Sequence, residues 1–368
     1  MRDALKDSIE RLLSDQVTPA LLRASEQGAF AMPLWQLIEQ NGFTLALVGE
    51  GHGGSGLAWA DVHGLVVAAG RHALPLPLPE TMLAAWLLSS AGIDVPGGPM
   101  TVGDTAGDTA GGPPLRASRH GSAWQLDGVL PLVPWARACS HVVCEVAVDG
   151  LLHIALLALA DVPRTDDMNL AREPRDSLAL RAAPALAVQP LPARLGPSPI
   201  RLFGAMLRSA QMAGAMERLV QQSVQYATER VQFGKPIGKF QAVQQQLAVL
   251  GCEWAATSAA AAFAFEQADG AGAELSIAAA KVRASEAAGK AASIAHATHG
   301  ALGFTYEHTL HFSTRRLWSW RSEFGHHAWW SRRIGAAVCA SATPFWERVT
   351  SGDVGVLCAP ARHTRETT

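Results

Sequence analysis

The sequence predicts an α+β protein that is mostly α-helical. Two observations carry this prediction: long segments with helical spacing of apolar residues fill both ends of the chain, and a stretch rich in Pro and Gly with short β-type runs separates them. A length of 368 residues indicates two or three domains. We expect an N-terminal helical domain at 1–96, a middle β domain at 97–198, a C-terminal helical bundle at 199–350 and a tail at 351–368.

The first 96 residues contain repeated amphipathic segments. Leu5, Ile9 and Leu13 lie on one face of a helix, and residues 60–73 and 80–91 are expected to form two more helices. The Gly-rich run at 49–56, which precedes these two helices, lacks the Lys-Ser/Thr of a P-loop. The indication that it binds phosphate is therefore weak.

The middle stretch changes character. Residues 124–128 indicate a strand that runs into a turn, and residues 141–146 and 151–157 indicate two further strands. Several short strands of this kind predict a small barrel or sandwich. The imperfect repeat at 103–112 is expected to be a surface loop.

From residue 199 onward, apolar residues recur at spacings of three and four. Five helices are expected, at 202–229, 237–268, 274–300, 306–320 and 327–343. Together they predict a bundle of four or five helices.

Composition excludes several function classes. The formal net charge is −2 with no long basic run, which argues against nucleic acid as a partner. The five cysteines are scattered without a C-x-x-C pair, and adjacent His326 and His327 do not share a helix face, so no metal site is expected. Neither a signal-peptide core nor an apolar run of membrane-spanning length is expected, and we predict a cytoplasmic protein.

The segment YATERVQFGKPIGKFQAVQQQLAVL at 226–250 carries the most information. Gly234 and Pro236 end one helix, and Pro236 suits the first turn of the next. The break also carries Arg230, Gln232 and Lys235, which are hydrogen-bond donors suited to an anionic ligand. Read from its residues alone, this segment is a helical hairpin with a polar turn.

This pattern, R-x-x-F-G-x-x-I followed by F-Q-A-V-Q, resembles the signature of the acyl-CoA dehydrogenase flavoprotein family. The resemblance extends to the helical–β–helical order of nearly the whole chain, with a short middle domain as in family members that pair with a related subunit. It implies that this turn binds FAD, usually that of a neighbouring subunit. The residues implied are Arg230, Gln232, Phe233, Phe240 and Gln241.

A second segment, HGALGFTYEH at 299–308, resembles the family pattern H-G-G-x-G-[FY]-T-x-E-H. It implies FAD contacts at His299, Gly300 and Gly303. Two residues depart from the family: Ala301 replaces a Gly, and Ala297 replaces a Gln that helps to hold FAD. The alternative interpretation is structural, with Gly300 ending one helix.

The resemblance implies a reaction in which a carboxylate removes a proton next to an acyl-CoA thioester and FAD accepts a hydride, with electrons then passed to an electron-transfer flavoprotein. At the usual position of the base this chain has Phe324, followed by Gly325, and Glu323 lies one residue earlier. The other family position for the base falls near Gly204, also without a carboxylate.

Three interpretations of the base stay open. Glu323 is the base through a local shift of the turn, or the base is Glu307 or a residue of a partner, or the chain is catalytically silent. In the middle domain, W-x-L-x-G is present at 124–128, but the small polar residue and Gly that usually meet the flavin are missing from 130–138.

Two functions are therefore predicted from the sequence. The first is FAD-dependent α,β-dehydrogenation of an acyl-CoA by a homodimer or homotetramer. The second is a silent partner subunit in a heteromer, which completes the FAD site of a catalytic homologue.

Overall fold

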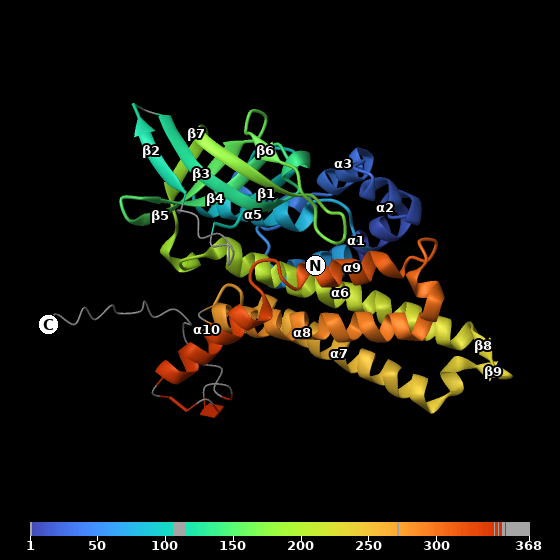
Figure 1. Cartoon of the computed structure of the whole chain (residues 1–368). Coiled ribbons are helices and arrows are strands. Elements are labelled where there is room, and N and C mark those ends of the chain that lie inside the picture. Colours follow the sequence, from blue (N-terminus) through green and yellow to red (C-terminus); the bar gives the residue numbers. More distant parts are fainter. Residues whose placement is uncertain are drawn as a thin grey trace.

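The computed structural model describes residues 2–105, 115–121, 123–270, 272–341, 343–344, 346–347 and 350. A β-rich part lies on one side of a long helical part, and the N-terminal helices lie beside both (Figure 1). The predicted α+β, mostly helical class is confirmed. The expected tail at 351–368 and most of the repeat at 103–112 lie outside the described residues.

The described N-terminal part has five α-helices, with two short 3₁₀ helices in the longer connection between α3 and α4. Thr18 caps α2 by accepting the Leu21 amide, and Pro19 occupies the first turn, where its missing N–H costs nothing. The last helix of this part is buried on every side from Leu78 to Leu88, so it lies in the interior of the molecule. The bounds are α1 Arg2–Gln16, α2 Pro19–Glu26, α3 Met32–Gln40, α4 Trp59–Arg71 and α5 Leu78–Ser90.

The β part is a closed barrel. Neighbouring strands follow the order β4-β2-β3-β7-β5, and β5 pairs back with β4, while β1 adds to β4 in parallel. The predicted strands lie in β3, β4 and β5, but β7 was not predicted. The bounds are β1 Met100–Gly103, β2 Arg116–His120, β3 Ala123–Pro134, β4 His141–Val148, β5 Leu151–Ala158, β6 Arg164–Thr165 and β7 Arg175–Pro190.

The C-terminal part is built around α6, a 31-residue helix. A short hairpin, β8 with β9, follows α6 and projects from one end of the molecule (Figure 1). The bounds are α6 Pro199–Glu229, β8 Val231–Gln232, β9 Lys235–Pro236, α7 Gln241–Gln267, α8 Ala273–His299, α9 Leu310–Trp320 and α10 His327–Ala340.

Two predicted helix starts were wrong. Residues 237–239 form a 3₁₀ turn, so α7 begins at Gln241; residues 305–309, which follow a 3₁₀ turn at 300–304, form bends and a turn, so α9 begins at Leu310. Before α7, the Gly-containing segment takes the tighter 3₁₀ turn and the helix becomes regular after it.

One hydrophobic core joins the N-terminal helices to α6, α7 and α8, whereas the barrel encloses a separate core. We propose domain boundaries near residues 96 and 198, in the connections that precede β1 and α6. The barrel is thus a separately packed unit that sits against a continuous helical body.

The expectation that no segment is long and apolar enough to span a membrane was wrong for α7. By length and composition alone this 27-residue helix could cross a membrane. Its many Ala residues raise the mean hydropathy more than its Gln residues lower it. Its inner face, including Leu250, Ala261 and Phe265, packs within the helical part. The helix therefore belongs to the folded helical body.

Candidate functional site

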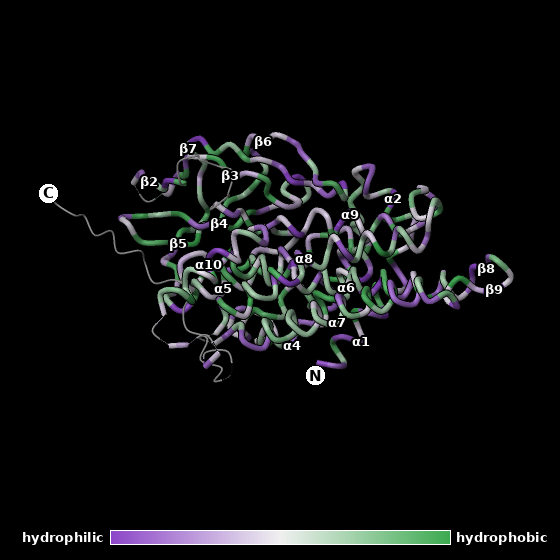
Figure 2. Tube along the Cα trace, turned by 60° about the horizontal axis from the view of Figure 1, so that its bottom comes forward, coloured by the Kyte–Doolittle hydropathy of each residue, from purple (hydrophilic) through white to green (hydrophobic). Residues whose placement is uncertain are grey.

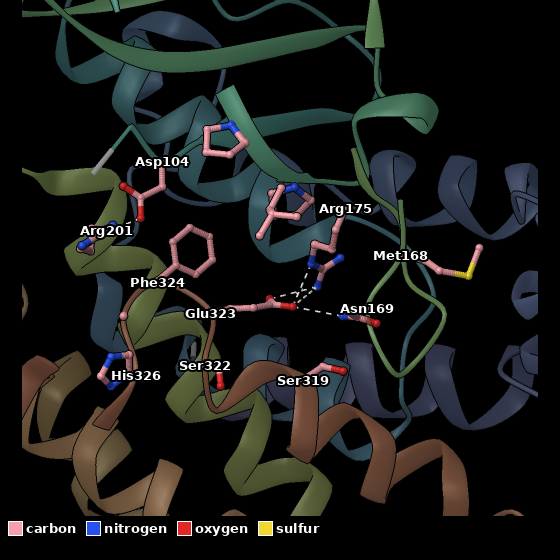
Figure 3. A pocket seen from close by; sticks show the side chains of 14 residues that line it. Asp104, Met168, Asn169, Arg175, Arg201, Ser319, Ser322, Glu323, Phe324 and His326 are labelled. Atoms are coloured by element: carbon pink, nitrogen blue, oxygen red, sulfur yellow. Dashed lines mark hydrogen bonds and ion pairs between the residues drawn. The ribbon is translucent and has the colours of Figure 1, made fainter. Parts of the chain in front are cut away.

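A cavity of about 470 Å³ lies between the barrel and the helical part. Its walls come from the end of β3, the loop before β7, the first turns of α6, and the turn between α9 and α10 (Figure 3). A cavity of this size accommodates a small organic ligand. Glu323, the predicted base, lies in its wall.

Glu323 is bound on both carboxylate oxygens. Arg175 of β7 donates through Nε and Nη2 at 2.8 and 3.0 Å, and Arg208 of α6 donates through Nε at 2.7 Å. Asn169 adds an amide hydrogen bond of 3.1 Å. Figure 3 shows the side chain directed toward Arg175 and Asn169 and away from the ring of Phe324.

These contacts determine the charge of Glu323. Burial alone would raise its pKa, but the guanidinium charges of Arg175 and Arg208 outweigh burial and hold the pKa at about 2. A base is effective when its pKa lies near the working pH, so a carboxylate with so low a pKa accepts a proton poorly. The local geometry therefore favours an ion-pairing role for Glu323.

The same arginines belong to a larger buried network. Arg208 also donates to Glu80 of α5 at 2.7 Å, and Arg175 donates to Glu173 at 3.0 Å. Glu173 in turn pairs with Arg316 of α9 at 3.1 Å. Three carboxylates and three guanidinium groups thus balance one another where the N-terminal helices, the barrel and the C-terminal helices meet.

The two family positions for the base face each other in the fold. Phe324 has a left-handed backbone (φ 53°), and its ring lies against Gly204. A Cβ atom at Gly204 would lie 2.5 Å from that ring, closer than atoms tolerate. One position is therefore filled by an aromatic ring, and the other is kept free of any side chain to make room for it.

The β3 end of the cavity offers few backbone donors to a flavin ring, which needs hydrogen bonds to its carbonyls and ring nitrogens. Pro131 and Pro134 of β3 have no N–H. The amide of Trp135 already donates to Pro174 O at 3.0 Å, and the amide of Arg137 donates to Asp176 at 2.8 Å. The residues at the barrel end of the cavity therefore fit a flavin ring poorly.

The predicted cofactor turn lies at the opposite end of α6. Phe233 is 91% exposed with φ 53°, and Phe240 packs edge-on to it with ring centroids 6.1 Å apart. Arg230, Gln232 and Gln241 are exposed, and within the described structure the Arg230 guanidinium makes no ion pair. These side chains are placed to meet a ligand that lies outside this chain's own core.

The second predicted turn lies beside the first. Tyr226 of α6 stacks on His299 with ring centroids 4.6 Å apart, and Gln222 donates to Thr309 at 2.8 Å. Gly300 ends α8 with φ 59°, as the structural interpretation expected. A Cβ at Gly303 would meet His299 at 2.9 Å, so local packing also accounts for this Gly.

The fold therefore brings the two cofactor turns together and keeps both away from Glu323. Gly204 lies against Phe324 of the cavity wall, and Arg230 lies at the cofactor turn, 26 positions further along the chain, about 39 Å at 1.5 Å per residue. The cavity and the cofactor turns therefore lie towards opposite ends of α6.

Several residues of the network were not anticipated. Glu80, Asn169, Arg175 and Arg208 lie in different elements, and no sequence motif links them. The other candidate for a base within this chain, Glu307, is exposed beyond the second turn and does not line the cavity. Among the described residues, no cluster of His, Cys, Asp and Glu is placed to hold a metal ion.

Comparison with known proteins decides the family. Residues 203–324 match the model of the acyl-CoA dehydrogenase C-terminal domain. The chain is 30% identical over 322 residues to the acyl-CoA dehydrogenase IpdE2 of Mycobacterium tuberculosis, covering 86% of this chain and 90% of that protein. The chain belongs to the acyl-CoA dehydrogenase family. It is thus related to flavoprotein oxidoreductases that act on CH–CH groups.

Solved structures share the fold. The ChsE4-ChsE5 complex from Mycobacterium tuberculosis superposes with a TM-score of 0.85 at 22% identity, covering 93% of this chain and 98% of that one. A Tcur3481-Tcur3483 steroid acyl-CoA dehydrogenase variant gives 0.80 at 23% identity, covering 96% and 99%. Relatives of this fold thus include complexes of two different chains.

Proposed function

We propose that this chain is the partner subunit of a heteromeric acyl-CoA dehydrogenase. The observation that carries the proposal concerns the base: Phe324 and Gly204 occupy the two family positions without a carboxylate, and neighbouring Glu323 is held by Arg175 and Arg208. The two-chain complexes among the solved structures of this fold support it.

In the assembly, the turn that follows the C-terminal end of α6 contacts the cofactor of the homologous subunit. Arg230 and Gln232 would donate hydrogen bonds to the phosphates of FAD bound in the homologous subunit, and Phe233 and Phe240, whose rings pack against each other, would cover the cofactor from solvent. FAD, when bound there, accepts the hydride from the substrate. The proton is removed by a carboxylate of the homologue, and electrons leave to an electron-transfer flavoprotein.

Purification with and without a longer family homologue tests this proposal. We expect flavin in the assembly, little flavin in this chain alone, and at least a tenfold loss of bound flavin with Arg230→Met. Anaerobic addition of acyl-CoA thioesters should bleach the flavin of the assembly. The first panel contains straight-chain, branched and steroid acyl groups, the last because one similar solved complex is a steroid enzyme.

Glu323→Gln separates the two predicted functions. The amide keeps the size of the side chain, and we expect the assembly to bleach at an unchanged rate. If this chain alone retains flavin that a thioester bleaches, and Glu323→Gln abolishes the bleaching while the fold stays intact by circular dichroism, the chain is a self-sufficient dehydrogenase with Glu323 as its base.

A further inference from the structure

Four histidines lie in one cluster beside the second cofactor turn. Two of them, His296 and His299, come from the last turn of α8. The other two, His308 and His311, flank the start of α9. The rings of His299 and His308 have centroids 4.8 Å apart, and the ring of His299 also stacks on Tyr226. The FAD contacts proposed for the first turn do not involve these four imidazoles.

Hydrogen bonds assign the proton in two of the rings. Nδ1 of His299 donates to the Ala295 carbonyl oxygen at 2.8 Å, and Nδ1 of His311 donates to the His308 carbonyl oxygen at 2.7 Å. A carbonyl oxygen only accepts, so Nε2 carries the lone pair when these rings are neutral. Both Nε2 atoms are buried, and neither has a hydrogen-bond partner in the described structure. A second proton on either ring would therefore create a buried N–H group without an acceptor.

The second cofactor turn packs directly on this cluster. A Cβ atom at Gly303 would lie 2.9 Å from Cβ of His299 and 3.5 Å from Nδ1 of His296, so the backbone of the turn touches α8 here. Phe304 is 75% exposed and stacks on the His296 ring with centroids 4.4 Å apart. Nδ1 of His296 is buried and also lacks a hydrogen-bond partner in the described structure. The conformation of residues 300–304 thus depends on rings that fit their surroundings in the uncharged form.

The surroundings of the cluster offer little negative charge to a protonated imidazole. Glu26 of α2, a helix that lies beside α9 (Figure 2), is a carboxylate that faces His311. It already pairs with Arg315 at 2.9 Å and accepts the hydroxyl of Tyr306. Glu307 of the connecting loop is exposed, so water screens its charge. Further groups that face the cluster are neutral or positive: Tyr226 of α6, Tyr306 of the loop, and Arg315 and Arg316 of α9.

These surroundings hold the pKa of all four imidazoles below the ordinary value of 6.5, chiefly because burial disfavours the charged form. The rings also oppose one another's protonation, since His299 and His311 lower the pKa of both His296 and His308. A group whose pKa is lowered by folding stabilises the folded form above its ordinary pKa, and this stability is lost as the pH falls. The packed turn is therefore fully stabilised at pH 7.5 and loses stability as the pH falls below 6.5.

We propose that this histidine cluster is a pH-sensitive element that regulates the second cofactor turn. With neutral rings, residues 300–304 stay packed on α8 and α9. When the rings take up protons, the like charges repel, the start of α9 separates from α8, and the turn opens. Among the described residues no cluster is placed to hold a metal ion, so the proton is the ligand that these nitrogens fit. One part of the inference rests on the proposed function: the open turn no longer contacts the FAD of the homologous subunit.

The chain alone tests the opening of the turn. Amide hydrogen exchange of the segment 296–312, corrected for the intrinsic effect of pH, should become about tenfold faster at pH 5.5 than at pH 7.5, because a shift of one pKa unit changes the opening equilibrium tenfold. The double variant His308→Gln/His311→Gln should remove most of this acceleration. If circular dichroism shows that it does not fold, His299→Phe replaces it, since a Phe ring keeps the stack on Tyr226 and takes up no proton.

His63→Phe is the matched control. His63 lies on α4 against Phe265, and burial lowers its pKa to about 4, so it stays neutral at both pH values. This variant should keep the full acceleration. Equal exchange of wild type at the two pH values, or an acceleration that survives the substitutions within the cluster, would overturn the proposal.

The assembly with the homologue tests the link to FAD. Flavin retained by the assembly after gel filtration should fall about tenfold from pH 7.5 to pH 5.5 with wild-type chain, and much less with the double variant. Unchanged or stronger retention at pH 5.5 would overturn the regulation of FAD binding. If the homologue binds no form of this chain at pH 7.5, the proposed function fails, and hydrogen exchange of the chain alone still decides whether protons open the turn.

Discussion

The two ends of α6 differ in how their charges are satisfied. At the N-terminal end, Arg208 is 2% exposed and lies between Glu80 and Glu323. At the C-terminal end, Arg230 is exposed and has no ion-pair partner in the described structure. A paired, buried charge maintains the fold, whereas an exposed and unpaired one remains available to a ligand. We therefore expect the N-terminal end of α6 to contribute to the stability of the fold and its C-terminal end to contribute to ligand binding.

Arg208→Met should give the largest effect on stability. It leaves the buried carboxylates of Glu80 and Glu323 without this partner, and breaking a buried ion pair costs about 3–5 kcal/mol. Urea unfolding followed by tryptophan fluorescence measures the loss. Arg230→Met, at the other end of the same helix, is the control and should change the free energy of unfolding by less than about 0.5 kcal/mol. Equal losses for both variants would contradict the assignment.

Glu145 of β4 should make stability fall as the pH rises. Its carboxylate accepts the Ile200 amide in the first turn of α6 at 2.9 Å, and burial raises its pKa to about 8. The folded-state pKa lies above the ordinary value of 4.5, so the protonated form is favoured in the fold. The resulting stability is fully present below pH 4.5 and is lost as the pH rises toward 8.

Glu145→Gln removes this titration and keeps the oxygen that accepts the Ile200 amide. Relative to wild type, we expect the variant to gain up to about 1.4 kcal/mol per pH unit between pH 5 and 8, measured by thermal unfolding. Glu229→Gln, exposed at the other end of α6, should show no such slope. If the stability difference between Glu145→Gln and wild type does not change with pH, Glu145 is not a buried group that titrates in this range.

Gly204→Ala should give a smaller loss that depends on Phe324. The new Cβ would overlap the ring, and overpacking of this kind costs about 1–3 kcal/mol. In the background of Phe324→Ala the cost should largely vanish. Gly251→Ala in α7 is the control: nothing lies within 4 Å of its Cβ position, so the change should stabilise the helix by up to about 1 kcal/mol. Additive effects of Gly204→Ala and Phe324→Ala would show that the two positions do not interact.

Sequence patterns predicted the helical ends of the chain well and the barrel incompletely. Apolar spacing located α4, α5, α6 and α8 to within a few residues, because each helix buries one face or more. The long strand β7 was missed because Ala is frequent in it and Pro184 interrupts it, and neither residue favours strands. Its pairing with β3 and β5 supplies what its own propensity lacks.

The candidate site, too, was predicted from the sequence only in part. The motifs at 230–241 and 299–303 could be recognised because each lies within a few consecutive residues. Sequence reasoning left Glu323 open as a base through a local shift of the turn, and residues 323 and 324 do lie in a turn, with φ 53° at Phe324. The roles predicted for Glu323 and for the cofactor residues stay predictions until the assembly is measured.

By itself, the sequence determined the order of helical and β segments, the two turns and the resemblance to a flavoprotein family, because these depend on residues close together in the chain. Only the tertiary structure decided what surrounds Glu323, since Asn169, Arg175 and Arg208 lie 115 to 154 residues away from it in sequence. Charge interactions depend on distance in space and on burial, and both arise only when the barrel and the helices have packed together.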